Sequence, residues 1–377
     1  MTKLVRHISV FLLAAAIAAP ASAGLLDKLK DPETGQVDIT NWLLKGGGFL
    51  PVPIIVTEPA VGFGLGLAPT FFHDFNHPET KQKDLTIEEF LEYPPSATAG
   101  FALYTTNGSW VAGAAHMGNY KQDRIRYTGA LAYADVNLKF YVLDNPLNFE
   151  MKGLFTIQDV RFKLGKTKWF LGADYGYFNS NVNFKLDEAP ESPGDSNSSN
   201  AGLGAIAYFD NRNTTFTPNT GREFETKISR YDTAFGGDYK YWQFDLDLKS
   251  FHQVAPKWVV GWRVKGTATD GDTPFWALPF VSMRGVPAMR YQGDSVAQIE
   301  TEARWDIKGP WSLLGFLGYG DTWTDGPLGK TDDLILAGGA GFRVNIAPKL
   351  NFRTGIDVAR GPEEWTIYLQ FGHAWGF

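Results

Sequence analysis

The stretch that decides the fold is "EWTIYLQFGHAWGF", residues 364–377. Large apolar side chains recur at every second position, with His373 as the exception: Trp365, Ile367, Leu369, Phe371, Trp375 and Phe377. Apart from Tyr368, the positions between them hold small or polar residues. Because successive side chains of a β-strand point to opposite faces, this pattern predicts a strand with one apolar face.

The same alternation recurs at 242–249, 258–265, 334–346 and 349–358. It fits a soluble sandwich with a buried apolar face, and equally a membrane barrel whose apolar face meets lipid. Strands of roughly ten to thirteen residues, Trp and Tyr near strand ends and an aromatic last residue favour the barrel. We therefore expect an all-β fold, a 16-stranded antiparallel transmembrane β-barrel. The expected strands are 49–57, 61–73, 96–107, 109–121, 124–141, 147–164, 168–186, 200–212, 221–234, 238–252, 256–269, 295–307, 310–323, 334–346, 348–360 and 363–377.

The N-terminus has the features of a secretory signal. Lys3 and Arg6 precede the apolar run 10–18, and small residues end at Ala23. We expect 1–23 to be a signal peptide, 24–48 a short periplasmic segment and 49–377 the barrel. An even strand count places the start of the first strand and the end of the last strand on the periplasmic side.

Composition removes several classes of protein. The 377 residues include no cysteine, so the exported chain folds without disulfides, and a net charge of −6 gives no basic footprint for nucleic acid. After the signal there is no apolar run of about 18 residues, as a transmembrane helix requires.

Three short motifs, in order along the chain, resemble those of one family. They are "FDNRNTTFTPNTG" at 209–221, "MRGVPAMRYQGD" at 283–294 and "GFLGYGDTW" at 315–323. Together they resemble the Omp85 superfamily, the BamA/TamA-like barrels with a bacterial surface antigen (D15) domain, over residues 49–377. The residues that carry the resemblance are Asp210, Arg212, Pro218, Gly221, Arg284, Gly285 and Phe316.

The resemblance implies a location and a function. It implies an integral protein of a Gram-negative outer membrane that takes part in inserting or translocating protein or lipid. It also implies that the sixth extracellular loop folds into the lumen, where Arg284 and Gly285 lock it near Phe316.

The chain departs from the family pattern in two places. The family's soluble POTRA domains need far more residues than 24–48 offers, so we expect a barrel without them. The family's acid two positions after the strand-thirteen aromatic is Gly318 here. We therefore expect Arg284 to pair with Glu300 or Glu302, which share one face of the strand 295–307.

Residues 274–294, "PFWALPFVSMRGVPAMRYQGD", are called the connector below. They do not alternate, and they combine large apolar side chains with arginines. If the connector were a loose surface loop its arginines would be solvated, but Trp276, Phe280 and Met283 would be exposed. The lumen location avoids that exposure.

Other candidate sites are weaker. His73 and His77 flank Asp74, Ser250 shares a strand face with His252, and neither arrangement predicts a metal site or an enzyme. We expect no cofactor. Residues 86–91 carry a capping box and predict a short periplasmic helix. A passive channel, with the lumen charges as its filter, is the alternative function.

Expected partners follow from a location in the outer membrane. They are outer-membrane lipids, lipopolysaccharide, the BAM machinery that would insert the chain by way of Phe371, Trp375 and Phe377 as a C-terminal assembly signal, and an unknown protein or lipid client. A homo-oligomer is left open. Prolines at 51, 53 and 59 and glycines at 372 and 376 predict that the first and last strands form the least bonded pair.

Overall fold

The computed structural model describes residues 49–73, 96–142, 145–184, 196–324 and 334–375. They form one sheet of 16 antiparallel strands, each hydrogen-bonded to its neighbours in sequence order. The strands are β1 (Phe49–Glu58), β2 (Gly62–His73), β3 (Ser96–Thr105), β4 (Trp110–Tyr120), β5 (Ile125–Val142), β6 (Asn145–Lys163), β7 (Trp169–Phe184), β8 (Ser196–Asp210), β9 (Gly221–Tyr231), β10 (Tyr241–Ala255), β11 (Trp258–Gly271), β12 (Ser295–Lys308), β13 (Trp311–Trp323), β14 (Ile335–Ala347), β15 (Phe352–Arg360) and β16 (Trp365–Phe371). The predicted strand number and all-β class are confirmed.

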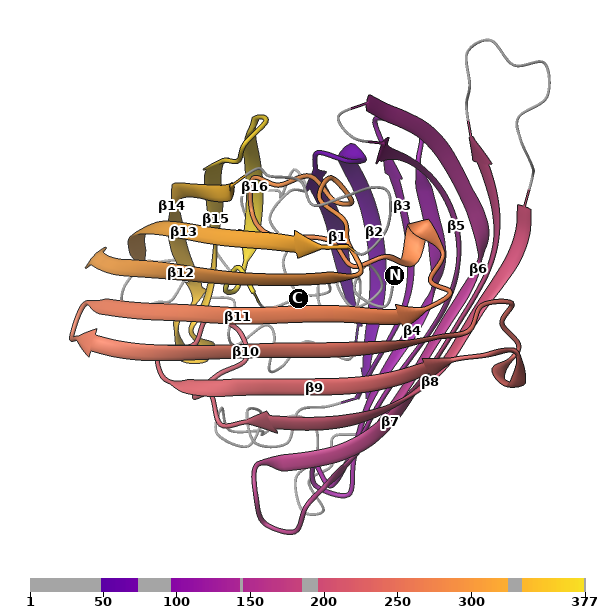
Figure 1. The fold of residues 1–377 in the computed structure, drawn as a ribbon. Coiled ribbons are helices and arrows are strands. Elements are labelled where there is room, and N and C mark those ends of the chain that lie inside the picture. Colours follow the sequence, from indigo (N-terminus) through magenta and orange to yellow (C-terminus); the bar gives the residue numbers. More distant parts are fainter. Residues whose placement is uncertain (1–48, 74–95, 143–144, 185–195, 325–333, 376–377) are drawn as a thin grey trace.

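The sheet curls round so that β1 and β16 lie beside each other (Figure 1). Among the described residues no backbone ladder joins these two strands. We call the end where β1 begins and β16 ends the terminal end, and the other the distal end. In the described ranges, no helix is long and apolar enough to cross a membrane.

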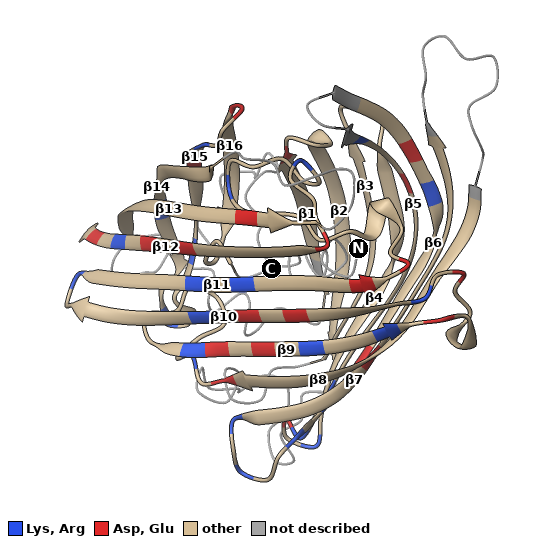
Figure 2. Cartoon of the chain, in the orientation of Figure 1, with Lys and Arg blue, Asp and Glu red and all other residues tan. Residues whose placement is uncertain are grey.

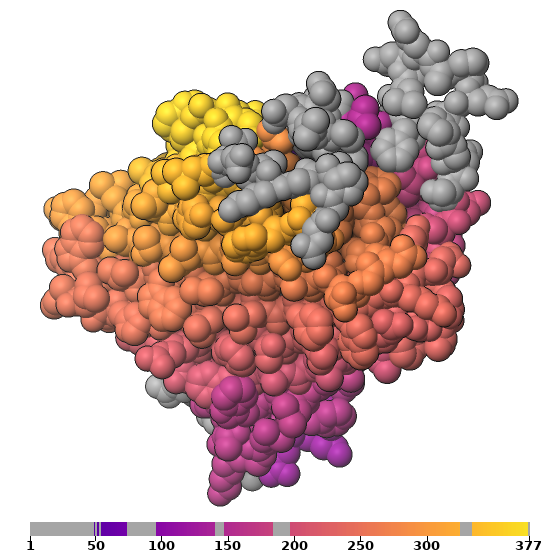
Figure 3. All heavy atoms as spheres, viewed as in Figure 1, coloured from indigo at the N-terminus to yellow at the C-terminus, as the bar shows by residue number. Residues whose placement is uncertain are grey.

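The outer face of the sheet is apolar. Leu65 of β2, Leu131 of β5 and Leu317 of β13 are each more than half exposed, and the side chains of β9 to β13 make a continuous outer wall (Figure 3). Exposed tryptophans stand at both ends of the strands: Trp169, Trp258, Trp305 and Trp311 at the terminal end, and Trp110, Trp242, Trp323 and Trp365 at the distal end. An apolar band between two aromatic girdles is the surface that a bilayer requires.

The inner face differs between the two halves of the barrel. β2, β3 and β4 contain no Asp, Glu, Lys or Arg at all, whereas charged residues recur along β9 to β12 (Figure 2). The buried apolar cluster runs over β1 to β7: Val52, Ile54, Ala68, Phe101, Val111, Ala115, Ala130, Ala132, Ala134, Val136, Phe149, Met151, Phe155, Phe178 and Val182.

The C-terminus departs from the predicted strand 363–377. β16 stops at Phe371, and Gly372 has a φ of 75°, a conformation that turns the chain and that glycine adopts readily. Trp375 then lies inside, 4% exposed, with its Nε1 donating to Glu300. The prediction that Trp375 shares the outer face of β16 is wrong, because parity holds only while the strand continues. Phe377, residues 1–48 and the predicted helix 86–91 lie outside the described residues.

Candidate functional site

The connector crosses the inside of the barrel and contacts both kinds of wall. It opens with the short 3-10 helix Phe275–Ala277. The Phe275 ring lies 5.4 Å from Phe149 of β6, and the Trp276 ring lies 5.5 Å from Phe178 of β7, both edge to face. This apolar part therefore packs on the apolar cluster of the first seven strands.

The basic part of the connector is held by carboxylates. Arg284 donates through Nη1 to Asp357 Oδ2 at 2.6 Å and through Nη2 to Glu302 Oε2 at 2.8 Å. Its guanidinium carbon lies 3.5 Å from the centre of the Phe316 ring. Arg284 is 8% exposed and Asp357 is fully buried. Two carboxylates and an aromatic face thus compensate the desolvation of one guanidinium.

The partners of Arg284 differ in part from those expected from sequence. Glu302 bonds to Arg284, whereas Glu300 lies 3.5 Å from Arg263 and accepts from Trp375. Asp357 of β15 was not expected as a partner. It also binds Arg343, with Nη2 to Oδ2 at 2.9 Å.

Gly318 explains why a carboxylate that pairs with Arg284 comes from β15 rather than from β13. A Cβ at Gly318 would stand 2.8 Å from the sulfur of Met283, the residue before Arg284. The connector therefore occupies the space that a side chain on β13 would need, and Asp357 supplies the charge from β15.

The connector also bridges β1 and β16. The Gly285 N–H donates to the Tyr368 hydroxyl of β16 at 2.9 Å, and the Ala288 N–H donates to Glu58 Oε1 of β1 at 3.0 Å. Gly285 has a φ of 93°, and a Cβ there would meet the Gly361 nitrogen at 3.0 Å, so this close approach requires glycine.

Ion pairs line the inner wall beyond Arg284. The charges on β6 to β12 form ion pairs within a strand, between neighbouring strands and between strands further apart: Arg161 with Asp159 and Glu225, Lys227 with Asp174, Lys249 with Glu223, Arg263 with Asp247, and Arg304 with Asp306. The positive and negative side chains of this wall therefore neutralise one another, and no row of charges of a single sign results.

The motif 209–221 forms the turn between β8 and β9 at the terminal end. Arg212 forks onto Asp210 at 3.0 and 2.8 Å, and Gly221 has a φ of 105° that lets the backbone close on Arg212. Pro218 is buried. The turn reaches across the barrel: the His373 N–H donates to Phe216 O at 2.8 Å, and the Asn351 amide donates to Asn219 at 3.0 Å.

Arg212 of this turn and His373, which follows β16 and contacts the turn, both lie outside the strands and have shifted pKa values. Burial lowers the pKa of Arg212, but the carboxylates of Glu223 and Asp210 outweigh it and raise that pKa. Burial, followed by the Arg212 charge, lowers the pKa of His373 well below its usual value. His373 is therefore neutral where its Nε2 lies 3.2 Å from Arg212 Nη1.

The weaker candidate sites are described only in part. Asp74 and His77 lie outside the described residues, and His73 contacts the Thr98 hydroxyl at 2.8 Å. Within the part of the chain that the structure describes, no group of three His, Asp or Glu side chains could hold a metal. Ser250 and His252 are 2.8 Å apart, on the outer face of β10.

Comparison with solved structures places the fold. The chain is similar to BamA from Haemophilus ducreyi lacking POTRA domains 1–3, with a TM-score of 0.59 and 12% identity over 93% of this chain and 80% of that one. It is also similar to CdiB from Escherichia coli, with a TM-score of 0.60 and 9% identity over 85% of this chain and 61% of that one. CdiB from Acinetobacter baumannii gives 0.54 and 8%, over 85% and 58%.

These likenesses show a barrel fold like that of BamA and CdiB. The chain spans less than two thirds of the two CdiB chains and about four fifths of the BamA chain. No protein-family model and no curated protein matches the sequence.

Proposed function

We propose that the protein is an outer-membrane barrel of the Omp85 type that inserts or translocates protein or lipid, and that β1 and β16 form its lateral opening. The supporting observation is the junction between these strands. They lie in contact without a ladder among the described residues, and Glu58 and Tyr368 are tied together through the connector instead.

In this proposal the connector is a latch. Arg284 anchors it to β12 and β15, and the backbone N–H groups of Gly285 and Ala288 hold one strand each. Releasing Arg284 removes the anchor that positions both N–H groups. A client could then pair with the freed strand edges, since unpaired edges readily accept another strand.

The test is site-specific photo-crosslinking in cells. A photoreactive residue replaces Ile367 on the outer face of β16, which is 60% exposed, and in a matched control replaces Leu131 on β5, which is 53% exposed. The proposal predicts a discrete protein or lipid adduct at 367 that is absent at 131. Equal adducts at both positions would show general lipid contact and contradict a lateral opening.

A passive channel remains the second candidate, because charged residues line β9 to β12 as they line selective pores. The connector argues against it, since its side chains Val281 and Tyr291 are almost fully buried inside the barrel. Planar-bilayer recording separates the two: the latch predicts near-silence in the wild type, and a steady open conductance favours the channel.

A further inference from the structure

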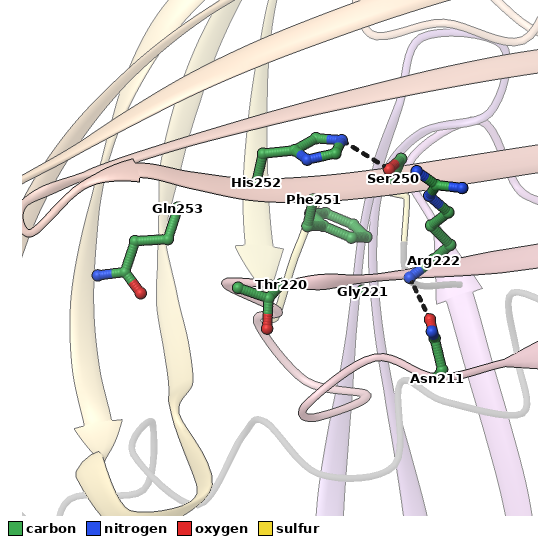
Figure 4. Close-up of a pocket in the computed structure, with 8 residues that line it drawn as sticks. All are labelled: Asn211, Thr220, Gly221, Arg222, Ser250, Phe251, His252 and Gln253. Carbon is green, nitrogen blue, oxygen red and sulfur yellow. Dashed lines mark hydrogen bonds between the residues drawn. The ribbon is translucent and has the colours of Figure 1, made fainter.

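A polar hollow lies at the terminal end of β9 and β10 (Figure 4). Arg222, Ser250 and His252 line it from the outer, membrane-facing face of these strands, whereas Phe251 and Gln253 have the parity of the inner face. Its volume is about 440 Å³. The lining residues are Asn211, Thr220, Gly221, Arg222, Ser250, Phe251, His252 and Gln253. None of them carries a carboxylate, although the whole chain has a net charge of −6. The hollow therefore suits an anion.

Arg222 is the cation of this hollow. Its side chain is exposed and, within the described residues, forms no ion pair, whereas Arg212, Arg263 and Arg284 on the inner side each have a carboxylate partner. Asn211 accepts the Arg222 backbone N–H at 2.7 Å through Oδ1, which leaves its amide NH₂ as a further donor.

The second polar group is the pair Ser250 and His252, joined from Oγ to Nε2 at 2.8 Å (Figure 4). A serine beside an imidazole can act as a nucleophile and its base. Here Ser250 is fully buried, and no described carboxylate or amide is bonded to the other nitrogen of His252. The pair thus fixes an imidazole at the rim of the hollow and lacks the access that hydrolysis needs.

The hollow lies at the edge of the apolar band. Trp169, Phe209 and Phe224 form an aromatic row on the outer face, with ring centres 5.1 and 6.0 Å from that of Trp169. Arg222 is two residues nearer the terminal end than Phe224 and on the same face of β9. Aromatic girdles mark the boundary between hydrocarbon and headgroups, so Arg222 stands at headgroup level.

We infer that this hollow binds the phosphate headgroup of a phospholipid in the leaflet at the terminal end. The Arg222 guanidinium matches two phosphate oxygens, and His252 and Asn211 add donors. Phe224 and Leu248, paired in register on the bilayer side, offer an apolar surface for the acyl chains. The site is separate from the β1–β16 junction, so a test of lipid binding here does not depend on the proposed lateral opening.

Native mass spectrometry of the purified full-length protein in detergent tests the site, with phosphatidylglycerol as the probe. Arg222→Gln should weaken the tightest lipid adduct about ten-fold, the loss of one charge-assisted contact. The matched control is Arg360→Gln, because Arg360 is also exposed and, within the described residues, without an ion pair, but stands at the distal end. It should bind as the wild type does.

Heat-modifiable gel mobility verifies that each variant is folded. If Arg222→Gln fails to fold, Arg222→Lys replaces it. Lysine keeps the positive charge but lacks the planar guanidinium that binds two phosphate oxygens at once, so lipid binding should still weaken measurably. Wild-type affinity in a folded Arg222 variant, or an equal loss in Arg360→Gln, would overturn the site.

Two further ligands test whether the hollow recognises a phospholipid, its acyl chains alone or free phosphate. Diacylglycerol, which has the chains without the phosphate, should bind far more weakly than phosphatidylglycerol, and equal binding would overturn the inference. Inorganic phosphate should compete only at concentrations far above those of the lipid. If it binds as tightly as the lipid, the hollow is a site for free phosphate and the lipid inference fails.

Discussion

The two halves of the inner wall are built differently. β2 to β4 carry no charged residue, whereas β9 alone places Glu223, Glu225 and Lys227 on this wall. A segment that crosses the lumen must pack apolar side chains on one wall and pair its charges with those of the other. The connector does so because its aromatic start packs on the apolar wall and its Arg284 end pairs with the charged wall. Its mixed composition follows from where it lies.

Asp357→Asn should have the largest effect, because it leaves two buried guanidiniums, Arg284 and Arg343, without their shared charge. Breaking a buried ion pair costs about 3–5 kcal/mol. We expect rapid cleavage of the connector by added protease, measured on folded protein. Glu302→Gln should have a smaller effect, because Arg284 then keeps Asp357. Equal protection of wild type and Asp357→Asn would contradict the ion-pair anchor.

Trp276→Ala probes the apolar wall instead. Trp276 is 6% exposed and contacts Phe178, so its truncation should cost about 3 kcal/mol in the free energy of unfolding. The measurement is the urea midpoint in lipid vesicles. Trp311→Ala is the control, since Trp311 is 52% exposed on the outer face and should shift the midpoint much less. Equal shifts would mean that the connector gains nothing from the apolar wall.

Gly318→Ala tests the fit of the connector over β13. The added methyl would stand 2.8 Å from the Met283 sulfur, and such overpacking costs about 1–3 kcal/mol. Gly315→Ala on the same strand is the control, because its nearest described neighbour would be 3.9 Å away. We expect bilayer conductance to rise in Gly318→Ala only. Silence in both variants would show that Met283 does not seal the lumen.

Glu300→Gln should have the smallest effect on the connector. Glu300 contacts Arg263, Trp375 and Gln298, and it forms no ion pair with Arg284, whose carboxylate partners are Glu302 and Asp357. The protease protection of the connector should stay as in the wild type. The fluorescence of the Trp375 indole should change, because its N–H donates to Glu300. A loosened connector would place Glu300 in the anchor after all.

Sequence reasoning reached the strands but only part of the site. Alternation works because lipid contact keeps one face of nearly every strand apolar, so the number of strands could be read directly. It could not show the apolar inner wall, because small residues such as Ala115 and Ala132 give no signal of which face they occupy.

Asp357 was missed for a different reason. Parity already placed it opposite the apolar face of β15, but it lies 73 residues from Arg284, and only the curl of the sheet brings them together. The C-terminal turn at Gly372 was missed because alternation in the sequence continues past the point where the strand stops. Both errors concern chain geometry that a local pattern does not contain.

Amide hydrogen exchange on the folded barrel tests most directly whether the connector, rather than a ladder, holds β1 to β16. In the wild type, amides of β1 and β16 should exchange faster than those of β12 to β15, because local opening follows missing backbone bonds. In Arg284→Ala the exchange of β1 and β16 should rise further while β5 to β7 stay unchanged. Uniform protection around the wild-type barrel, or no response of β1 and β16 to Arg284→Ala, would contradict the account.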